Sequence, residues 1–138
     1  MLIALAAAAT STAVAVLALL MLRRRYLVVD VTGPSMTPTY LDGDRVLVRR
    51  TRGDKVRPGQ VVVLQGPLLP WAEPLGLLLK RVTAVPGDAV PTYVTGAPAH
   101  VPAGMLVVLS DNPAAGVDSR TVGLFSTAGV AGVVLRRM

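Results

Sequence analysis

V-T-G-P-S-M-T-P-T, residues 31–39, lies between an uncharged N-terminal segment and a series of short runs rich in Val and Leu. Its central residue, Ser35, follows Pro34 and comes shortly before Pro38. Each proline fixes its own φ angle and restricts the residue before it, so this serine occupies backbone with few accessible conformations. Such a segment suits a nucleophile, and it is equally typical of a surface turn. Residues elsewhere in the chain distinguish the two interpretations.

The chain from residue 26 onward alternates short apolar runs with Gly, Pro and Asp. That pattern is typical of short strands joined by turns and predicts an all-β fold, a small barrel or sandwich. The apolar stretch 66–79 contains the single tryptophan, Trp71, and is either a core strand or a surface at a membrane interface. The predicted strands are residues 26–31, 45–50, 60–65, 76–85, 105–110 and 131–137.

The N-terminal segment, residues 2–22, carries no charge and consists mainly of Ala, Leu and Val. As a helix it would extend about 31 Å, enough to cross a bilayer core. We therefore predict one transmembrane helix within an anchor and basic flank, residues 1–25, followed by a single domain, residues 26–138. A cleavable signal is less favoured, because Arg23, Arg24 and Arg25 follow the segment instead of preceding it. The same arginines favour a cytoplasmic position for the domain.

The composition excludes several kinds of site. The net charge is +6, and without Arg23, Arg24 and Arg25 the remainder has 11 basic against 8 acidic residues, a net +3. No basic stripe with interleaved aromatic residues is present, so nucleic acid is not a predicted partner. The absence of cysteine and the single histidine, His100, exclude disulfides and zinc–thiolate sites, and we predict no metal and no cofactor. A Ser-His-Asp triad would have to use His100, which lies in a Pro- and Ala-rich stretch typical of a loop.

Lys80 offers a different base for serine chemistry. It ends the apolar run L-G-L-L-L, whereas most lysines are solvated surface charges. A lysine on a buried strand has a lowered pKa, because burial disfavours the ammonium form. A neutral amine within reach of Ser35 could take its proton, and a Ser-Lys pair needs no histidine.

Four sequence motifs resemble those of the type I signal peptidase family, in the same order and with similar spacing. They are S-M-x-P-T at 35–39, R-P-G-Q-V-V-V at 57–63, K-R-V-x-x-x-P-G-D at 80–88 and S-D-N-x(5)-D-S-R at 110–120. The resemblance covers nearly all of residues 31–137 and implies a small β-rich Ser-Lys endopeptidase core, the catalytic domain of residues 26–138. It implies that Ser35 is the nucleophile and Lys80 the general base.

The resemblance also implies roles for neighbouring residues. The backbone N–H of Ser35 would stabilise the oxyanion, within a substrate pocket formed by Gly33, Pro34, Ser35 and Met36. The residues implied to support the site are Arg81, Asp111, Asn112, Asp118, Ser119 and Arg120. An alternative for Asp118 and Arg120 is a solvated ion pair that contributes under about 1 kcal/mol.

Three positions depart from the pattern of the family. Gly33 stands where many relatives have a serine that adds a second oxyanion contact. Gly116 stands where many have a serine that orients the lysine, and Gln60 replaces a usual aspartate. The sequence therefore leaves the second oxyanion donor and the partner of Lys80 unassigned.

The function that the resemblance implies is removal of signal peptides from exported proteins by a membrane-anchored serine endopeptidase. Its partners would be membrane lipid and a precursor with small residues before the cut, and its catalytic domain would lie outside the cytoplasm. One alternative is a dedicated propeptide protease with a cytoplasmic domain, resembling those that mature nickel superoxide dismutase. Another is a membrane-tethered domain that binds a partner without cleaving it, which Gly33 and Gly116 would allow.

Overall fold

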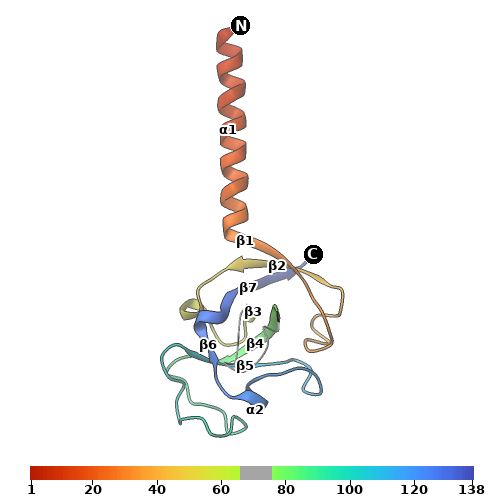
Figure 1. Ribbon diagram of the computed structural model, residues 1–138, viewed down its shortest axis with the longest axis vertical. Coiled ribbons are helices and arrows are strands. Elements are labelled where there is room, and N and C mark those ends of the chain that lie inside the picture. The colour runs from red at the N-terminus through yellow and green to blue at the C-terminus, as the bar shows by residue number, and fades with distance from the viewer. Residues whose placement is uncertain (66–75) are drawn as a thin grey trace.

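The N-terminal segment forms one helix that projects away from the rest of the protein (Figure 1). The computed structural model of the chain describes residues 1–65 and 76–138, with side chains in this helix described from residue 8 onward. The helix, α1 (Leu2–Arg25), ends with three arginines in its last turn, where the helix dipole favours positive charge. The predicted helix is therefore present.

The predicted role of α1 as a membrane span is not supported. Within the described residues, no helix combines the length and the apolar character that crossing a membrane requires. The described part of α1 includes Thr10, Ser11 and Thr12 together with the three terminal arginines, and these residues lower its mean hydropathy.

The rest of the described chain is built around one antiparallel sheet with the strand order β1-β2-β7-β3-β4-β5-β6. The all-β prediction is confirmed, and the predicted strand 45–50 has the observed bounds. The helix α2 (Ser119–Val122) and the 3-10 turns η1 (Gly53–Lys55) and η2 (Thr127–Gly129) are too short to leave a periodic signal in the sequence. The strands are β1 (Tyr26–Asp30), β2 (Arg45–Arg50), β3 (Val61–Leu64), β4 (Leu78–Ala84), β5 (Met105–Leu109), β6 (Phe125–Ser126) and β7 (Val130–Arg137).

The central strand β3 is buried on both faces. Its side chains alternate between faces, so Val61 and Val63 belong to one core cluster and Val62 and Leu64 to a second. Each fully buried valine or leucine contributes about 1.5–3 kcal/mol relative to exposure, as an upper estimate. The sheet therefore provides two packed faces on which neighbouring strands are held in a fixed register.

Residues 66–75, which include Trp71, lie outside the described residues, and so does most of the predicted apolar stretch. The described residues continue from Gly76, shortly before β4 begins at Leu78.

Candidate active site

The turn that carries Ser35 follows β1 and is held by its own backbone. The N–H of Thr37 donates to the carbonyl of Pro34 at 3.1 Å, and the N–H of Tyr40 donates to the carbonyl of Met36 at 2.9 Å. Met36 is completely buried in the first core cluster, with Val29 of β1 and Val31, the residue after that strand. Its burial anchors the turn in the core and leaves Ser35 half-buried at the surface.

The backbone N–H groups of this turn differ in whether they have a hydrogen-bond acceptor. Gly33 adopts a φ of +84°, which favours glycine, and its N–H donates to Oδ1 of Asp42 at 2.8 Å. Pro34 has no N–H group. Within the described part of the chain, the N–H of Ser35 has no acceptor. That N–H is therefore available as a hydrogen-bond donor beside the serine hydroxyl.

Lys80 lies on β4, between β3 and β5, and only 1% of it is exposed. It pairs with Val62 across the β3–β4 ladder, beside the second core cluster. Burial lowers the pKa of the Lys80 ammonium; the negative charge of Asp118 opposes this effect, and the positive charge of Arg120 adds to it. The net pKa of Lys80 is below its ordinary value, as a proton acceptor requires.

Ser35 and Lys80 converge at Gly116. A methyl group added at Gly116 would lie 2.9 Å from Cβ of Ser35 and 3.2 Å from Nζ of Lys80. Cβ of Ser35 and Nζ of Lys80 therefore lie no farther apart than the sum of these two distances. Gly116 also has a φ of +85°, a conformation that residues with side chains rarely adopt. The glycine thus permits the close approach, and a serine at this position would collide with Ser35 in this conformation.

The segment after β5 binds the serine turn through Asp111 and Asn112. The carboxylate of Asp111 accepts a bond from Oγ1 of Thr39 at 2.6 Å, and the N–H of Asn112 donates to the carbonyl of Ser35 at 2.9 Å. Nδ2 of Asn112 donates to the carbonyl of Pro34 at 3.2 Å. These contacts connect the turn that carries Ser35 to a segment more than 70 residues away along the chain.

Asp111 is itself held by Arg81, the residue after Lys80 on β4. Nε and Nη2 of Arg81 donate to the two carboxylate oxygens at 2.8 and 2.6 Å. Nη1 donates to the carbonyl of Gly59 at 2.8 Å. The hydrogen bonds from Arg81 lower the pKa of Asp111, so the carboxylate stays ionised.

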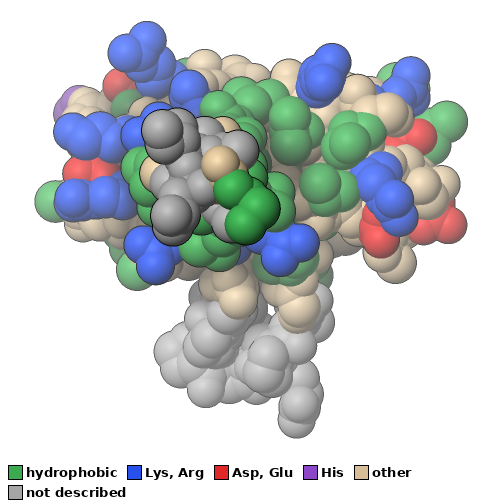
Figure 2. All heavy atoms as spheres, turned by 90° about the horizontal axis from the view of Figure 1, so that it is seen from above, with side chains coloured by type: hydrophobic (Ala, Val, Ile, Leu, Met, Phe, Trp, Pro, Cys, Tyr) green, Lys and Arg blue, Asp and Glu red, His purple; other side chains and the backbone are tan. Residues whose placement is uncertain are grey.

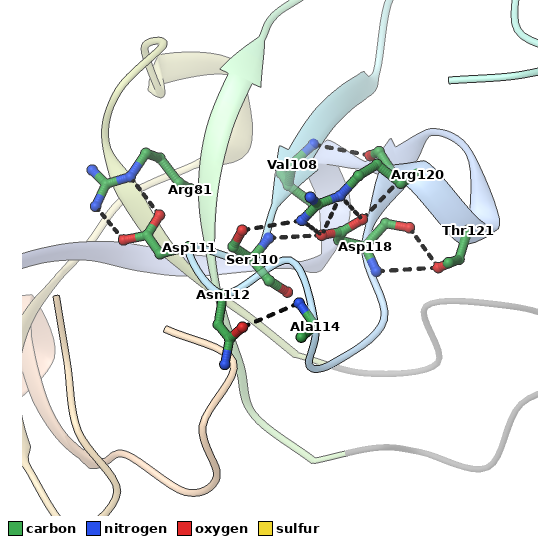
Figure 3. Close-up of polar contacts among 10 residues, drawn as sticks. Arg81, Val108, Ser110, Asp111, Asn112, Ala114, Asp118, Arg120 and Thr121 are labelled. Atoms are coloured by element: carbon green, nitrogen blue, oxygen red, sulfur yellow. Dashed lines mark hydrogen bonds and ion pairs between the residues drawn. The ribbon is translucent and has the colours of Figure 1, made fainter. Parts of the chain in front are cut away.

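A second Arg–Asp pair holds the same segment from the other side (Figure 3). Asp118 is buried; its carboxylate accepts the N–H of Ser110 at 2.9 Å and Nη2 of Arg120 at 2.6 Å. Burial alone would raise the pKa of Asp118, but the hydrogen bonds from Arg120 and from the Ser110 N–H outweigh it, and the net pKa is lowered. Asp118 also caps α2 through a capping box with Thr121.

Two further serines lie beside this pair. The hydroxyl of Ser119 accepts the N–H of Val108 at 3.0 Å, which fixes α2 against β5. Ser110 is 5% exposed, and the methyl group imagined at Gly116 would lie 3.2 Å from its Oγ. Ser110 is not among the residues predicted for the site. The signal that could have revealed it is a serine that ends a strand directly before the Asp-Asn pair.

The remaining titratable candidates lie elsewhere. His100 is exposed and pairs with Ala89 in an isolated bridge of the β4–β5 connection. Among residues 1–65 and 76–138, no group of three His, Asp or Glu side chains is arranged to hold a metal ion.

Comparison with known protein families gives one match. A family model described as "Signal peptidase, peptidase S26" matches residues 4–94, which include Ser35 and Lys80. No curated protein matches the sequence. A solved structure of a signal peptidase I from Enterococcus faecalis V583 is similar at 20% identity, covering 59% of this chain and 97% of that chain, with a TM-score of 0.45.

Proposed function

The chain belongs to the signal peptidase family S26, as its motifs predicted, and from this membership we propose that it is a serine endopeptidase that uses Ser35 and Lys80 as a catalytic dyad. The observation that carries the proposal is the convergence at Gly116. There Cβ of Ser35 and Nζ of the buried Lys80 lie 2.9 and 3.2 Å from the point that a methyl group on Gly116 would occupy. A lysine with a lowered pKa beside a serine has the properties of a general base beside its nucleophile.

The proposed reaction begins with a neutral Lys80. Its Nζ takes the proton from Oγ of Ser35 while Oγ attacks the carbonyl carbon of the scissile peptide bond. The N–H of Ser35 donates to the resulting oxyanion, and a donor of this kind contributes about 3 kcal/mol to the transition state. The Lys80 ammonium then gives its proton to the leaving amine. Water attacks the acyl-enzyme ester, again with Lys80 as base, and frees Ser35.

The proposed substrate is an extended segment of a precursor protein with small side chains, typically alanine, one and three positions before the cut. This part of the proposal rests on family membership. A shallow cleft selects small residues by steric exclusion of larger ones.

We include association with a membrane in the proposal, because an apolar groove of about 630 Å³ lies where α1 meets the sheet. Leu22, Val28 and Leu135 line it, and each is about half-exposed. Figure 2 looks down on this face and shows hydrophobic side chains with Lys and Arg side chains around them. Apolar surface rimmed with arginine suits the headgroup region of an anionic bilayer.

Cleavage of a peptide that contains Ala-x-Ala tests the dyad. We expect the full chain in a non-ionic detergent to cleave it, and Ser35→Ala and Lys80→Ala each to reduce kcat by about 10⁴-fold or more. Arg57→Gln, an exposed change outside the site, is the matched control and should retain activity. Retained cleavage in either dyad variant would remove that residue from the proposed mechanism.

The position of Arg23, Arg24 and Arg25 favours a second candidate function. They lie in the last turn of α1, on the side of the catalytic domain, where the positive-inside tendency predicts cytoplasm. A cytoplasmic domain suits a dedicated propeptide protease, like those that mature nickel superoxide dismutase, and does not suit export processing. Digestion of intact cells with an external protease separates the two, since only a domain outside the cytoplasm would be cut.

A further inference from the structure

The hydroxyl of Ser110 is buried without a partner. Within the described residues, its Oγ is a buried side-chain oxygen that makes no hydrogen bond. Leaving a buried hydroxyl unpaired costs about 1–3 kcal/mol, so native proteins rarely retain one without a reason. Chemistry at the neighbouring groups is one such reason.

The backbone of Ser110 is fixed on both sides. Its N–H donates to the Asp118 carboxylate at 2.9 Å, and its carbonyl accepts from Nη2 of Arg120 at 3.2 Å (Figure 3). A buried ion pair therefore determines where this residue stands. The side chain retains only the rotation about its Cα–Cβ bond.

The register of the sheet brings Ser110 to Lys80. Arg81 of β4 pairs with Leu109 of β5 in an antiparallel ladder. One step further along this register, Ser110 stands opposite Lys80, and residues opposite each other in such a ladder have Cβ atoms about 4.5–5.5 Å apart.

Gly116 leaves open the space between the two side chains. Nζ of Lys80 and Oγ of Ser110 each lie 3.2 Å from the point that a Gly116 methyl group would occupy. The two atoms are therefore separated by no more than twice that distance. Resting on the Ser-Lys function proposed above, we infer that Ser110 is a positioning residue, whose hydroxyl rotates about the Cα–Cβ bond to accept a hydrogen bond from Nζ of Lys80 and so aims Nζ at Ser35.

A serine hydroxyl suits this role because its oxygen accepts hydrogen bonds. It accepts an N–H of Nζ from both the ammonium form and the neutral amine of Lys80, and so leaves the lone pair of the neutral amine free for the proton of Ser35. The lysine is therefore held in place while it takes that proton and while it gives it to the leaving amine. Misplacement of a catalytic group by about 1 Å can cost about a hundredfold in rate.

Two variants of the full chain test the inference through kinetics. We expect Ser110→Ala to lower kcat/KM about tenfold or more and to change the melting temperature by only a few degrees, because a single hydrogen bond, the one to Lys80, is lost. Ser110→Thr keeps the hydroxyl and should recover most of the activity. Ser126→Ala is the matched control; its hydroxyl accepts the N–H of Ala128 in η2, away from Lys80, and kcat/KM should not change.

A second readout does not need catalysis. The chain has two lysines, Lys55 and Lys80, so lysine-selective isotope labelling gives two NMR signals that Lys55→Arg assigns. In an inactive Ser35→Ala background, Ser110→Ala should move the Lys80 titration to lower pH, because an acceptor of the ammonium is lost. The Lys55 signal in the same sample is the internal control.

Failure of the inference is distinguishable from failure of the proposed function. If Ser35→Ala abolishes cleavage while Ser110→Ala leaves kcat/KM and the Lys80 titration unchanged, the dyad stands and Ser110 has no positioning role. If the chain cleaves no peptide but Ser110→Ala still moves the Lys80 titration, the contact stands and the peptidase function does not.

Discussion

Two Arg–Asp pairs hold the segment after β5 from opposite sides, and they differ in what they control. Arg81–Asp111 joins β4 to the serine turn through Thr39, over long distances along the chain. Asp118–Arg120 is a local pair two residues apart, and it fixes the backbone of Ser110. The first pair therefore positions the turn that carries Ser35, and the second fixes the backbone of Ser110, which stands opposite Lys80.

The electrostatic roles of the pairs differ as well. The charges that act on the Lys80 pKa, besides its burial, are those of Asp118 and Arg120. Asp118 is also the more buried carboxylate, with 4% of its side chain exposed against 13% for Asp111. The Arg81–Asp111 pair thus holds the serine turn in position, whereas the Asp118–Arg120 pair also affects the pKa of Lys80.

The largest predicted effect on stability is that of Asp118→Asn. The substitution removes the buried negative charge that pairs with Arg120. We expect the free energy of unfolding to fall by about 3 kcal/mol. This value is at the lower end of the range for buried ion pairs, because Arg120 is partly exposed. The pH at which activity rises should fall, because the Asp118 charge raises the Lys80 pKa in the wild type. Denaturant titration and kcat/KM against pH measure the two effects.

Asp54→Asn is the matched control for that change. Asp54 pairs with Arg52 at the same spacing of two residues, but both side chains are largely exposed. Its removal should cost under about 0.5 kcal/mol and leave the pH profile in place. Equal stability of the two variants would show that Asp118–Arg120 is merely a surface pair.

Asp111→Asn is predicted to have an intermediate effect. It weakens two charge-assisted bonds from Arg81 and the one from Thr39, at a cost of about 1.5–3 kcal/mol. A looser serine turn should lower kcat/KM by about ten- to a hundredfold. The midpoint of the pH profile should not move, and a shift as large as that of Asp118→Asn would abolish the distinction between the two pairs.

Among the three site variants, Lys80→Met is expected to change the free energy of unfolding least, and it is the one variant that should raise it. The folded state binds the Lys80 proton more weakly than the unfolded state does, so this lysine destabilises the fold below its ordinary pKa. Replacing it should raise the free energy of unfolding at neutral pH by about 1 kcal/mol, a few degrees in melting temperature. The gain should shrink as pH rises toward about 10, where both states lose the proton. A gain that grows with pH, or one that Lys55→Met reproduces, contradicts this sign.

The strands could be predicted from the sequence because they depend on local patterns, and Ser35 and Lys80 stood out as candidates for the same reason. Apolar runs bounded by Gly, Pro and Asp correspond to β2 and β5, and Lys80 ends such a run. The role inferred for Ser110 depends instead on strand register, and the β4–β5 ladder contains an irregularity between Val82 and Ala84 that no sequence pattern reveals.

The contacts around the serine turn likewise could not be predicted from local sequence patterns. Gly116 could be recognised from the sequence as a departure from the family, but its left-handed φ and its contact with Ser35 depend on the folded chain. The same holds for Asp42, whose bond to the Gly33 N–H connects two turns. Tertiary contacts of this kind decide which polar groups are left available at the site.

The most direct test of the central claim, that Lys80 is the base, is the pH dependence of kcat/KM, measured alongside the NMR titration of Lys80. Activity should rise toward alkaline pH with a midpoint that matches the Lys80 titration, below the ordinary lysine value, because kcat/KM reports the free enzyme. A profile that is flat between about pH 6 and 9, or a profile whose midpoint differs from that of the Lys80 titration, would contradict the role of Lys80 as base.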